Sequence, residues 1–501
     1  MAREGAESET ALSAAGAKSD RYRTLRRRQY DLIVIGGGSA GISAAQLAAT
    51  LGARVALLDR EALGGECLFT GCVPSKALLH VAHTAAQVRA AGALGLETQL
   101  APVDLGQVAN YVQRAIQTVQ AQSDNPAHFV EMGVDIAFGA VRFTRRDSVT
   151  VNGQPVRAKR FLIATGSHAT VPPIPGLAGS DYLTNETIFS LRDLPRRLGI
   201  IGGGPVGCEL GQAFARLGSQ VTILQRAERL LPKDEPEASA LLRSRLEAEG
   251  VVVETQANVT QVERREDKKV VRFDTPAGAR DIETDAILVA VGRSPNIAGL
   301  QLDVAGVRYD TRTGIAVDAR LRTSNSCIYA AGDVIGGYRF THAAARQGRT
   351  AVRNALFPGS ARLDERVMPW ATFTEPVVAH VGLTETQARQ RHGESVRVFV
   401  QPFREVDRAM TDNAPEGFVK LVGAQDGALL GAQVVGRSAG EYINELALAL
   451  QGQLSLVDLA ATTHVYPTMA LAIQQAAGQY TSGKLGRSRF VRVMRLLRAT
   501  Y

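Results

Sequence analysis

The fold of this chain is decided by the stretch Leu32-Ile33-Val34-Ile35-Gly36-Gly37-Gly38-Ser39-Ala40-Gly41. A short apolar run, typical of a buried strand, leads directly into a G-x-G-x-x-G turn. The Ala-rich text after it, from Ile42 to about Leu51, predicts a helix, and Arg54–Asp59 predicts a second strand. A strand, a glycine turn, a helix and a second strand make a βαβ unit that opens a parallel sheet.

The same pattern returns later in the chain. An apolar run at 198–201 meets a second glycine turn, Gly202-Gly203-Gly204-Pro205-Val206-Gly207, followed by a helical stretch to about Leu217 and a strand at 220–224. The offset is 166 residues both for the first glycine and for the end of the second strand. Because each turn follows a strand and opens a helix, backbone N–H groups and the helix dipole can receive a pyrophosphate. The repeat predicts two dinucleotide-binding domains.

The residue that ends the second strand differs between the two units. Asp59 in the first unit can bind an adenosine ribose hydroxyl. The second unit has Gln225 there, followed by Arg226 and Arg229. A carboxylate would repel a 2′-phosphate, whereas an amide beside two guanidinium groups favours it. We therefore expect the second unit to bind NADPH rather than NADH.

A cysteine pair comes after the first unit, in Gly64-Gly65-Glu66-Cys67-Leu68-Phe69-Thr70-Gly71-Cys72-Val73-Pro74-Ser75-Lys76. Five residues of an ideal helix rise about 7.5 Å, more than a disulfide tolerates. Bridging the pair therefore requires a distorted helix start, which Gly71 and Pro74 can accommodate. In a chain without a secretory signal, such a disulfide is more typical of catalysis than of structure. No second Cys/His pair stands nearby, so we expect no resident metal.

Together with three further motifs, these features resemble the flavin-dependent pyridine nucleotide-disulfide oxidoreductases. The further motifs are Ala164-Thr165-Gly166-Ser167, Val291-Gly292-Arg293-Ser294-Pro295-Asn296 and Tyr329-Ala330-Ala331-Gly332-Asp333. The resemblance covers about residues 30–483 and is greatest to the mercuric reductase and dihydrolipoamide dehydrogenase branch. It implies an enzyme that is a homodimer.

The fold implied by this resemblance is α/β, with two Rossmann-like dinucleotide-binding domains (for FAD and NAD(P)) and a C-terminal α+β dimerisation domain. The predicted division is a disordered basic tail at 1–29, a discontinuous FAD-binding domain at 30–175 and 297–366, an NAD(P)-binding domain at 176–296, a dimerisation domain at 367–483 and a basic amphipathic extension at 484–501.

The resemblance also implies roles for individual residues. FAD would be held by Gly36, Gly38, Gly41, Asp59, Lys76, Gly139, Thr165, Gly166 and Asp333. The nicotinamide cofactor would be held by Gly202, Gly204, Gly207, Arg226, Arg229 and Gly292. Cys72 would be the thiol that faces the flavin, and Cys67 would meet the electron acceptor. Lys76 and Glu209 would pair close to the reactive edge of the flavin.

Near the C-terminus the chain departs from the disulfide-reducing members. These carry a His-Pro dipeptide with a glutamate five residues after the histidine, whereas this chain has Tyr466 and Leu471 in those places. Tyrosine, with a reference pKa of about 10, is a poor proton shuttle at neutral pH. His464, two residues earlier, would face the opposite side if the segment is extended.

The departure at Tyr466 favours a metal ion or a quinone over lipoamide or glutathione as the acceptor. Mercuric reductases have a tyrosine in the corresponding region, but also a C-terminal cysteine pair. The remaining cysteines here, Cys208 and Cys327, are typical of core positions. Two alternatives stay open: a dihydrolipoamide dehydrogenase, and a redox-sensing flavoprotein that docks on a membrane or an acidic partner.

The charge of the chain is concentrated at its ends. Of a formal net charge of +8, residues 1–29 carry +3 and residues 484–501 carry +6, which leaves 44 basic and 45 acidic residues between them. A near-neutral body argues against nucleic-acid binding. No apolar run reaches the roughly 18 residues that span a bilayer, and no secretory signal precedes Tyr30, so we expect a cytoplasmic protein.

The C-terminal extension could still touch a membrane surface. It has an apolar stripe along one side of an expected helix, and arginines surround this stripe. The stripe consists of Phe490, Val493, Met494 and Leu497. A basic amphipathic helix of this kind can lie on an anionic membrane, but it can equally pack on its own domain.

Overall fold

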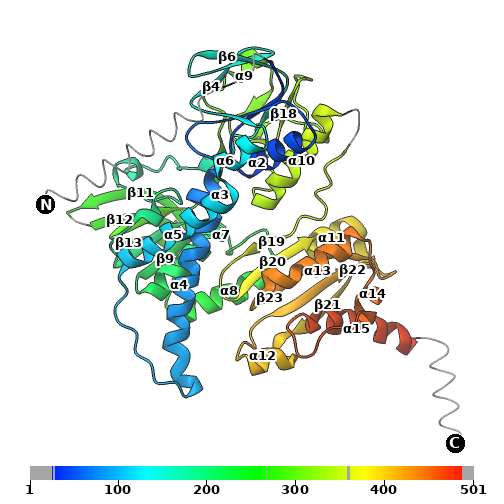
Figure 1. The fold of residues 1–501 in the computed structure, drawn as a ribbon. Coiled ribbons are helices and arrows are strands. Elements are labelled where there is room, and N and C mark those ends of the chain that lie inside the picture. The colour runs from blue at the N-terminus through cyan, green and yellow to red at the C-terminus, as the bar shows by residue number, and fades with distance from the viewer. Residues whose placement is uncertain (1–24, 26–28, 267, 358–360, 488–501) are drawn as a thin grey trace, which may run out of the picture.

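A computed structural model describes residues 25, 29–266, 268–357 and 361–487. It has three bodies, which Figure 1 shows at the top, the lower left and the lower right. The first two each contain one glycine turn, and the third contains the C-terminal part of the chain. The α/β fold predicted from the sequence is confirmed.

The upper body is built on a mostly parallel sheet around β1 (Gln29–Ile35). Its strand order is β3-β2-β1-β6-β5-β4, and β18 (Ile328–Ala330) pairs with β6. Residues 32–35 of β1 are buried, so apolar residues line both faces of this part of the strand. Helices α2 (Ser39–Thr50) and α10 (Thr341–Leu356) cover one face side by side. The other strands are β2 (Val55–Asp59), β3 (Asp135–Phe138), β4 (Val141–Arg145), β5 (Ser148–Val151) and β6 (Gln154–Ile163).

The lower-left body repeats the βαβ unit. Its parallel sheet has the order β10-β9-β8-β14, and an antiparallel sheet β11-β12-β13 lies beside it. The parallel part comprises β8 (Arg197–Ile201), α7 (Pro205–Leu217), β9 (Gln220–Gln225), α8 (Pro236–Ala248), β10 (Val252–Thr255) and β14 (Ala286–Val289). The antiparallel strands are β11 (Asn258–Arg265), β12 (Lys268–Thr275) and β13 (Gly278–Thr284).

The chain crosses between these two bodies at a pair of short strands. β7 (Ser167–Ala169) leads out of the upper body, and β15 (Arg293–Pro295) returns to it. The two strands pair antiparallel, with Ser167 opposite Pro295 and Ala169 opposite Arg293. Small elements complete the upper body: α6 (Pro126–Glu131), α9 (Leu302–Ala305), β16 (Tyr309–Asp310), β17 (Gly314–Ile315) and η4 (Asp333–Ile335).

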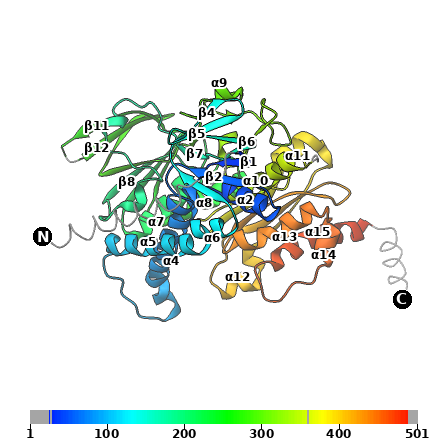
Figure 2. The ribbon, with the colours of Figure 1, turned by 45° about the horizontal axis from the view of Figure 1, so that its top comes forward.

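The cysteine pair lies where three helices connect the upper and lower-left bodies. These are α3 (Gly65–Phe69), α4 (Cys72–Ala90) and α5 (Leu105–Ser123), with η1 (Ala91–Leu94) after α4. Helix α4 packs against both α5 and α7, as Figure 2 shows. One buried cluster contains Leu78 of α4, Val112 of α5 and Phe214 of α7. The cysteines are thus attached to both dinucleotide-binding units.

The C-terminal body is an antiparallel sheet in the order β19-β20-β23-β22-β21. Helices α13 and α15 pack against it. Its strands are β19 (Trp370–Thr372), β20 (Val377–Gly382), β21 (Arg397–Pro402), β22 (Phe418–Gly423) and β23 (Leu429–Gly436). Its helices are α11 (Glu385–His392), α12 (Asp407–Thr411), α13 (Ala439–Gln451), α14 (Leu456–Ala461) and α15 (Leu471–Arg487).

The two basic ends predicted from the sequence fall largely beyond the described part of the chain. Most of the predicted tail at 1–29 and the apolar stripe at 490–497 lie outside the described residues. Helix α15 continues to Arg487, past the boundary predicted at 483. Among the described residues, no helix has the length and hydropathy needed to cross a membrane.

Candidate redox-active site

The two cysteines lie on different helices. Helix α3 ends at Phe69 and α4 begins at Cys72, with Gly71 before it. A Cβ atom on Gly71 would lie 2.9 Å from the carbonyl oxygen of Glu66, so the tight connection requires glycine. Because the helix is interrupted here, the two cysteines are not held about 7.5 Å apart as they would be on one ideal helix. The interruption lies at Gly71, which with Pro74 was expected to allow a distorted helix start. Both cysteines are free thiols in this structure.

One hydroxyl group contacts both thiols. The Oγ1 atom of Thr341, at the start of α10, donates to Cys67 Sγ at 3.1 Å and lies 3.4 Å from Cys72 Sγ. Sequence reasoning missed Thr341, because it is separated from Cys72 by 269 residues. Its position results from the packing of α10 beside α2 in the upper body.

Lys76 and Glu209 form an ion pair one turn along α4 from Cys72. Lys76 Nζ lies 2.8 Å from Glu209 Oε2, and the buried Glu209 also accepts a hydrogen bond from the backbone N–H of Phe373. The ammonium group stands 4.5 Å from the centre of the Phe373 ring. Helices α4 and α7 and the segment before β20 therefore fix the position of one positive charge.

The two thiols have opposite electrostatic environments. The hydrogen bond from Cys67 lowers the pKa of Cys72 to about 6, although burial opposes it, and the contact with the Thr341 hydroxyl and the charge of Lys76 act in the same direction as Cys67. The same hydrogen bond, together with burial, raises the pKa of Cys67 above its usual value. At neutral pH the dithiol thus holds its proton on Cys67 and its negative charge on Cys72.

Glu66, next to Cys67, belongs to a network that no sequence motif indicated. Its carboxylate makes paired contacts of 2.6 Å with the Arg293 guanidinium and accepts a 2.8 Å hydrogen bond from Asn185. Burial, partly offset by Arg293, raises the pKa of Glu66 to about 7. The sequence offered one signal for this network, a charged residue beside a cysteine of the motif. Because the partners of Glu66 are remote in sequence, the network itself could not be predicted.

The first glycine turn has the form that a dinucleotide requires. Gly37 N donates to Asp59 Oδ2 at 2.6 Å, which fixes the turn to the end of β2. A Cβ atom on Gly41 would collide with the carbonyl oxygen of Gly36, so the helix can approach the strand only with glycine there. A Cβ atom on Gly38 would meet little, so the space above the turn is open. The turn fits the pyrophosphate of FAD.

Three other residues predicted to hold FAD, Thr165, Gly166 and Asp333, lie around the crossover strands. Asp333 Oδ2 accepts a 2.6 Å hydrogen bond from Ser167 Oγ, and Thr165 Oγ1 donates to the carbonyl oxygen of Asn296. A Cβ atom on Gly166, which has φ of 71°, would meet nothing within 4 Å. At Gly139 it would collide with the Asn152 side chain, which gives this glycine a packing role.

The second glycine turn repeats the first with an amide in place of the carboxylate. Gly203 N donates to Gln225 Oε1 at 3.0 Å, and a Cβ atom on Gly207 would collide with the carbonyl oxygen of Gly202. A Cβ atom on Gly204 or Gly292 would meet nothing within 4 Å. This turn also fits a pyrophosphate.

The two predicted phosphate-binding arginines differ in their surroundings. Arg226 is exposed at the end of β9. The Arg229 guanidinium donates to the carbonyl oxygens of Pro232 and Asp234. Its Nε atom is buried and has no hydrogen-bond partner among the described residues.

Tyr466 lies in the C-terminal body and is 66% exposed. Its hydroxyl donates to Asp407 Oδ2 at 2.8 Å, and this carboxylate raises the pKa of the tyrosine. His464 uses both ring nitrogens within its own subunit: Nε2 lies 2.9 Å from Glu445 Oε1, and Nδ1 lies 3.1 Å from the Thr462 carbonyl oxygen. Its side chain is only 7% exposed, so the structure gives His464 a packing role.

A second ionic network holds α4 against its neighbours. Arg216, on α7, pairs with Glu249 and Glu375, and Glu375 also contacts His83 of α4 at 2.7 Å. Although burial raises the pKa of Glu375, the hydrogen bond from His83 and the charge of Arg216 lower it to about 2. No pattern in the sequence indicated this network.

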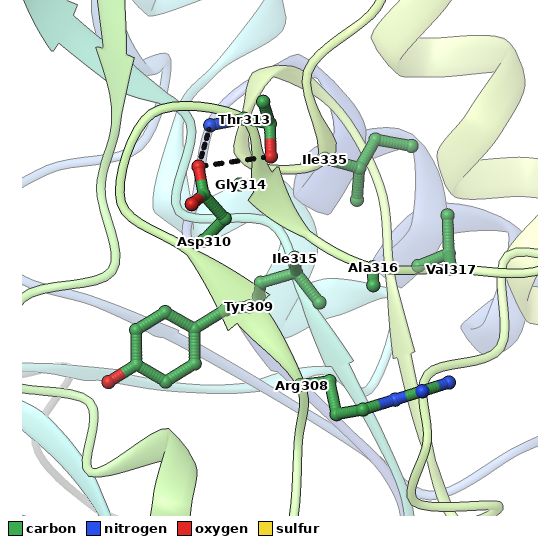
Figure 3. A pocket seen from close by; sticks show the side chains of 9 residues that line it. All are labelled: Arg308, Tyr309, Asp310, Thr313, Gly314, Ile315, Ala316, Val317 and Ile335. Carbon is green, nitrogen blue, oxygen red and sulfur yellow. Dashed lines mark hydrogen bonds between the residues drawn. The ribbon is translucent and has the colours of Figure 1, made fainter.

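A hollow of about 510 Å³ lies away from the cysteines. It surrounds the β16–β17 hairpin, and Figure 3 shows the Asp310 carboxylate bound to the N–H and hydroxyl groups of Thr313. None of the predicted site residues lines it. Within the described part of the chain, no cluster of three or more His, Cys, Asp or Glu side chains could hold a metal ion.

Two family models cover most of the chain. The model described as pyridine nucleotide-disulphide oxidoreductase matches residues 30–348, and the dimerisation domain of the same family matches residues 368–477. The predicted family is therefore confirmed.

Individual relatives belong to the same group. A mercuric reductase of Bacillus cereus is 39% identical over 89% of this chain and 71% of its own length. A dihydrolipoyl dehydrogenase of Thermus scotoductus is 38% identical over 90% of this chain and 97% of its own length.

Solved structures agree with this assignment. The Cu(II) complex of the HOCl-induced flavoprotein disulfide reductase RclA from Escherichia coli aligns with a TM-score of 0.80 at 28% identity, covering 90% of this chain and 100% of that one. LpdA from Mycobacterium tuberculosis aligns with a TM-score of 0.81 at 29% identity, covering 89% and 99%. The chain belongs to the class I pyridine nucleotide-disulfide oxidoreductases, and it is an FAD-dependent enzyme of that family with a C-terminal dimerisation domain.

Proposed function

We propose that the enzyme oxidises NADPH and passes two electrons through Cys67 and Cys72 to a small acceptor, in the first place a reducible metal ion and otherwise a quinone. The observation that carries the proposal is the thiol arrangement: two cysteines joined by Thr341, of which Cys72 lies in the electrostatic field of Lys76. This arrangement supports a thiol and a thiolate at neutral pH, the state that delivers electrons.

Each part of the site would have its own task in this reaction. Bound FAD would supply the two-electron relay between the nicotinamide and the cysteine pair. The first glycine turn and Asp333 would hold that cofactor, and Lys76 would stabilise the charge on Cys72. When the Cys67 thiol and the Cys72 thiolate close to a disulfide, two electrons and one proton leave the pair, and the acceptor takes the electrons.

The surroundings of Tyr466 support a metal ion over a disulfide as acceptor. Reducing a disulfide requires a proton for the leaving thiolate, and a tyrosine whose pKa is raised by Asp407 holds its proton too tightly to shuttle it at neutral pH. A metal ion needs no such proton. The names of the relatives include mercuric reductases, and one aligned structure is a Cu(II) complex.

The second unit supports NADPH over NADH. The neutral Gln225 ends β9, Arg226 is exposed beside it, and the Arg229 Nε atom is buried without a partner in the described chain. Comparing kcat/KM for the two cofactors tests this choice, and a preference for NADH would overturn it.

We further propose a homodimer that works in the cytoplasm. The dimerisation domain supports self-association, and a catalytic dithiol is typical of a reducing compartment. Light scattering of the purified chain tests the first statement, and fractionation of cells tests the second.

A dihydrolipoamide dehydrogenase is the second candidate, favoured by the Thermus scotoductus relative that aligns over nearly its whole length. The deciding experiment is anaerobic NADPH oxidation with Hg(II), Cu(II), quinones, lipoamide or glutathione disulfide. We expect turnover with a metal ion or a quinone that is lost in Cys72→Ser. Efficient turnover with lipoamide, or its reverse with dihydrolipoamide, would favour the second candidate.

A further inference from the structure

Glu66 connects the cysteine segment to a remote part of the chain. Both of its carboxylate oxygens contact the Arg293 guanidinium at 2.6 Å, although the two residues are 227 positions apart. Asn185, which is buried, donates both to Glu66 and, at 3.1 Å, to the carbonyl oxygen of Thr70. Asn185 thus holds both the Glu66 side chain, which is next to Cys67, and the backbone of the segment between the two cysteines.

Arg293 continues the connection to the crossover strands. Its Nε atom donates to Ser167 Oγ at 2.7 Å, and Nη2 donates to the Ser167 carbonyl oxygen at 2.8 Å. Ser167 Oγ in turn donates to Asp333, one of the residues predicted to hold FAD. The chain of contacts therefore runs from the residue beside Cys67, through β15 and β7, to the FAD-binding region.

We propose that Glu66 is a positioning residue of the redox centre: by its paired contacts with Arg293 it fastens the Cys67–Cys72 segment to the crossover between the two dinucleotide-binding units. This inference deepens the proposed function and rests on it. A paired Arg–carboxylate contact gives geometric definition as well as energy, as a positioning role requires.

The groups around these residues determine the sign of the electrostatic effect. Glu66 faces Arg293 of β15, Asp333 of η4, Cys72 of α4 and Glu186 of the loop before η3 (Ile188–Ser190). Cys72 faces Cys67 of α3, Thr341 of α10, Lys76 of its own helix and Glu209 of α7. Glu66 and the Cys72 thiolate repel each other, so loss of the carboxylate favours the thiolate. Because the pKa of Glu66 is about 7 and that of Cys72 about 6, Glu66 is mostly protonated where Cys72 titrates, and this effect on the pKa of Cys72 is small.

The test compares thiol reactivity in variants of the full-length holoenzyme. The protein is reduced with a phosphine, and the alkylation of Cys67 and Cys72 by iodoacetamide is followed by peptide mass spectrometry over a series of mildly acidic to alkaline buffers. We expect Glu66→Gln to change the apparent pKa of the Cys72 thiol by no more than about 0.2 pH unit and to raise the alkylation rate of the Cys67 thiol about fivefold, because the paired contact no longer holds the segment. Arg293→Met should raise that rate by about as much, whereas Glu66→Asp, which keeps the carboxylate, should leave it within about twofold of the wild-type value.

A matched control is available on the same body. Asp31 and Arg54 also form a paired ion contact, at 3.0 Å, near the start of β1 and just before β2. Asp31→Asn should leave the alkylation profile unchanged. If Glu66→Gln leaves the alkylation rate of the Cys67 thiol unchanged, Glu66 has no such role.

Kinetics provide a second readout. We expect Glu66→Gln to lower kcat for acceptor reduction about fivefold while KM for NADPH stays constant, because only the cysteine side of the enzyme is displaced. If Arg293→Met fails to fold, the contrast between Glu66→Gln and Glu66→Asp still decides the question. The alkylation profile needs no turnover, so failure of the proposed function would appear in the acceptor screen and not in this measurement.

Discussion

The two βαβ units have nearly the same backbone but different surroundings. In both, the N–H of the second glycine donates to the residue that ends the second strand, at 2.6 Å in the first unit and 3.0 Å in the second. In both, the fourth glycine position tolerates no Cβ atom, because the carbonyl oxygen of the first glycine occupies that space. The backbone of a dinucleotide site is therefore set by close approach of helix and strand, independently of which nucleotide it holds.

The differences lie in one side chain and in the segment after it. The first unit ends its second strand with a carboxylate and continues into the cysteine segment, whereas the second ends with an amide and continues through two arginines into α8. In the proposed reaction the first unit thus lies next to the cysteine pair, where electrons leave for the acceptor. The second unit lies where NADPH supplies them. Substitutions at matched positions should separate these two halves of the reaction.

The largest expected effect comes from blocking electron transfer from the cysteine pair to the acceptor. Cys72→Ser should lower reduction of the acceptor by about 1000-fold or more, because the disulfide can no longer form, while NADPH should still bleach the flavin. Steady-state assays and anaerobic stopped-flow absorbance measure the two steps. Cys327→Ser, at a partly buried cysteine outside the site, is the control. Retention of a tenth of the activity by Cys72→Ser would show that electrons leave by another route.

A smaller effect is expected from matched glycine substitutions. Gly41→Ala and Gly207→Ala place the same Cβ atom against the same carbonyl oxygen in the two units. Gly41→Ala should purify with little FAD, whereas Gly207→Ala should keep FAD and bind NADPH about 100-fold more weakly, because its helix moves away from β8. Flavin absorbance and fluorescence titration measure these losses. The comparison fails if either variant loses the other unit's cofactor instead.

The sequence predicts those features of the two units that are local. The expected helices and strands of both repeats agree with α2, β2, α7 and β9 to within about three residues. The contacts of Thr341 with the thiols, of Glu66 with Arg293, and of His83 with Glu375 could not be predicted, since the partners lie 274, 227 and 292 positions apart. Such contacts depend on how the bodies pack, which hydropathy patterns along one segment do not encode.

The electrostatic asymmetry of the thiols leads to a prediction about pH. The hydrogen bond from Cys67, the contact with the Thr341 hydroxyl and the cation of Lys76 lower the pKa of Cys72 to about 6 against the effect of burial. That pKa should therefore rise in Lys76→Met. At pH 7 the thiolate fraction and the rate of acceptor reduction should fall about tenfold, and both should recover as the pH is raised toward about 9. Glu209→Gln should shift the pH profile in the opposite direction, because the Glu209 carboxylate raises that pKa. Parallel shifts in both variants would show that loss of packing, and not charge, controls the thiol.

The smallest expected effect tests the one side chain that distinguishes the units. Gln225→Glu places a carboxylate where the first unit has Asp59, without removing the hydrogen bond from Gly203 N. The new charge should repel a 2′-phosphate, so the ratio of kcat/KM for NADPH to that for NADH should fall about fivefold. The matched change in the first unit, Asp59→Asn, should weaken FAD retention and leave the cofactor ratio constant. If Gln225→Glu does not change that ratio, the residues at the end of β9 do not select between NADPH and NADH at the 2′-position of the ribose. Arg226 and Arg229 then lose their proposed role.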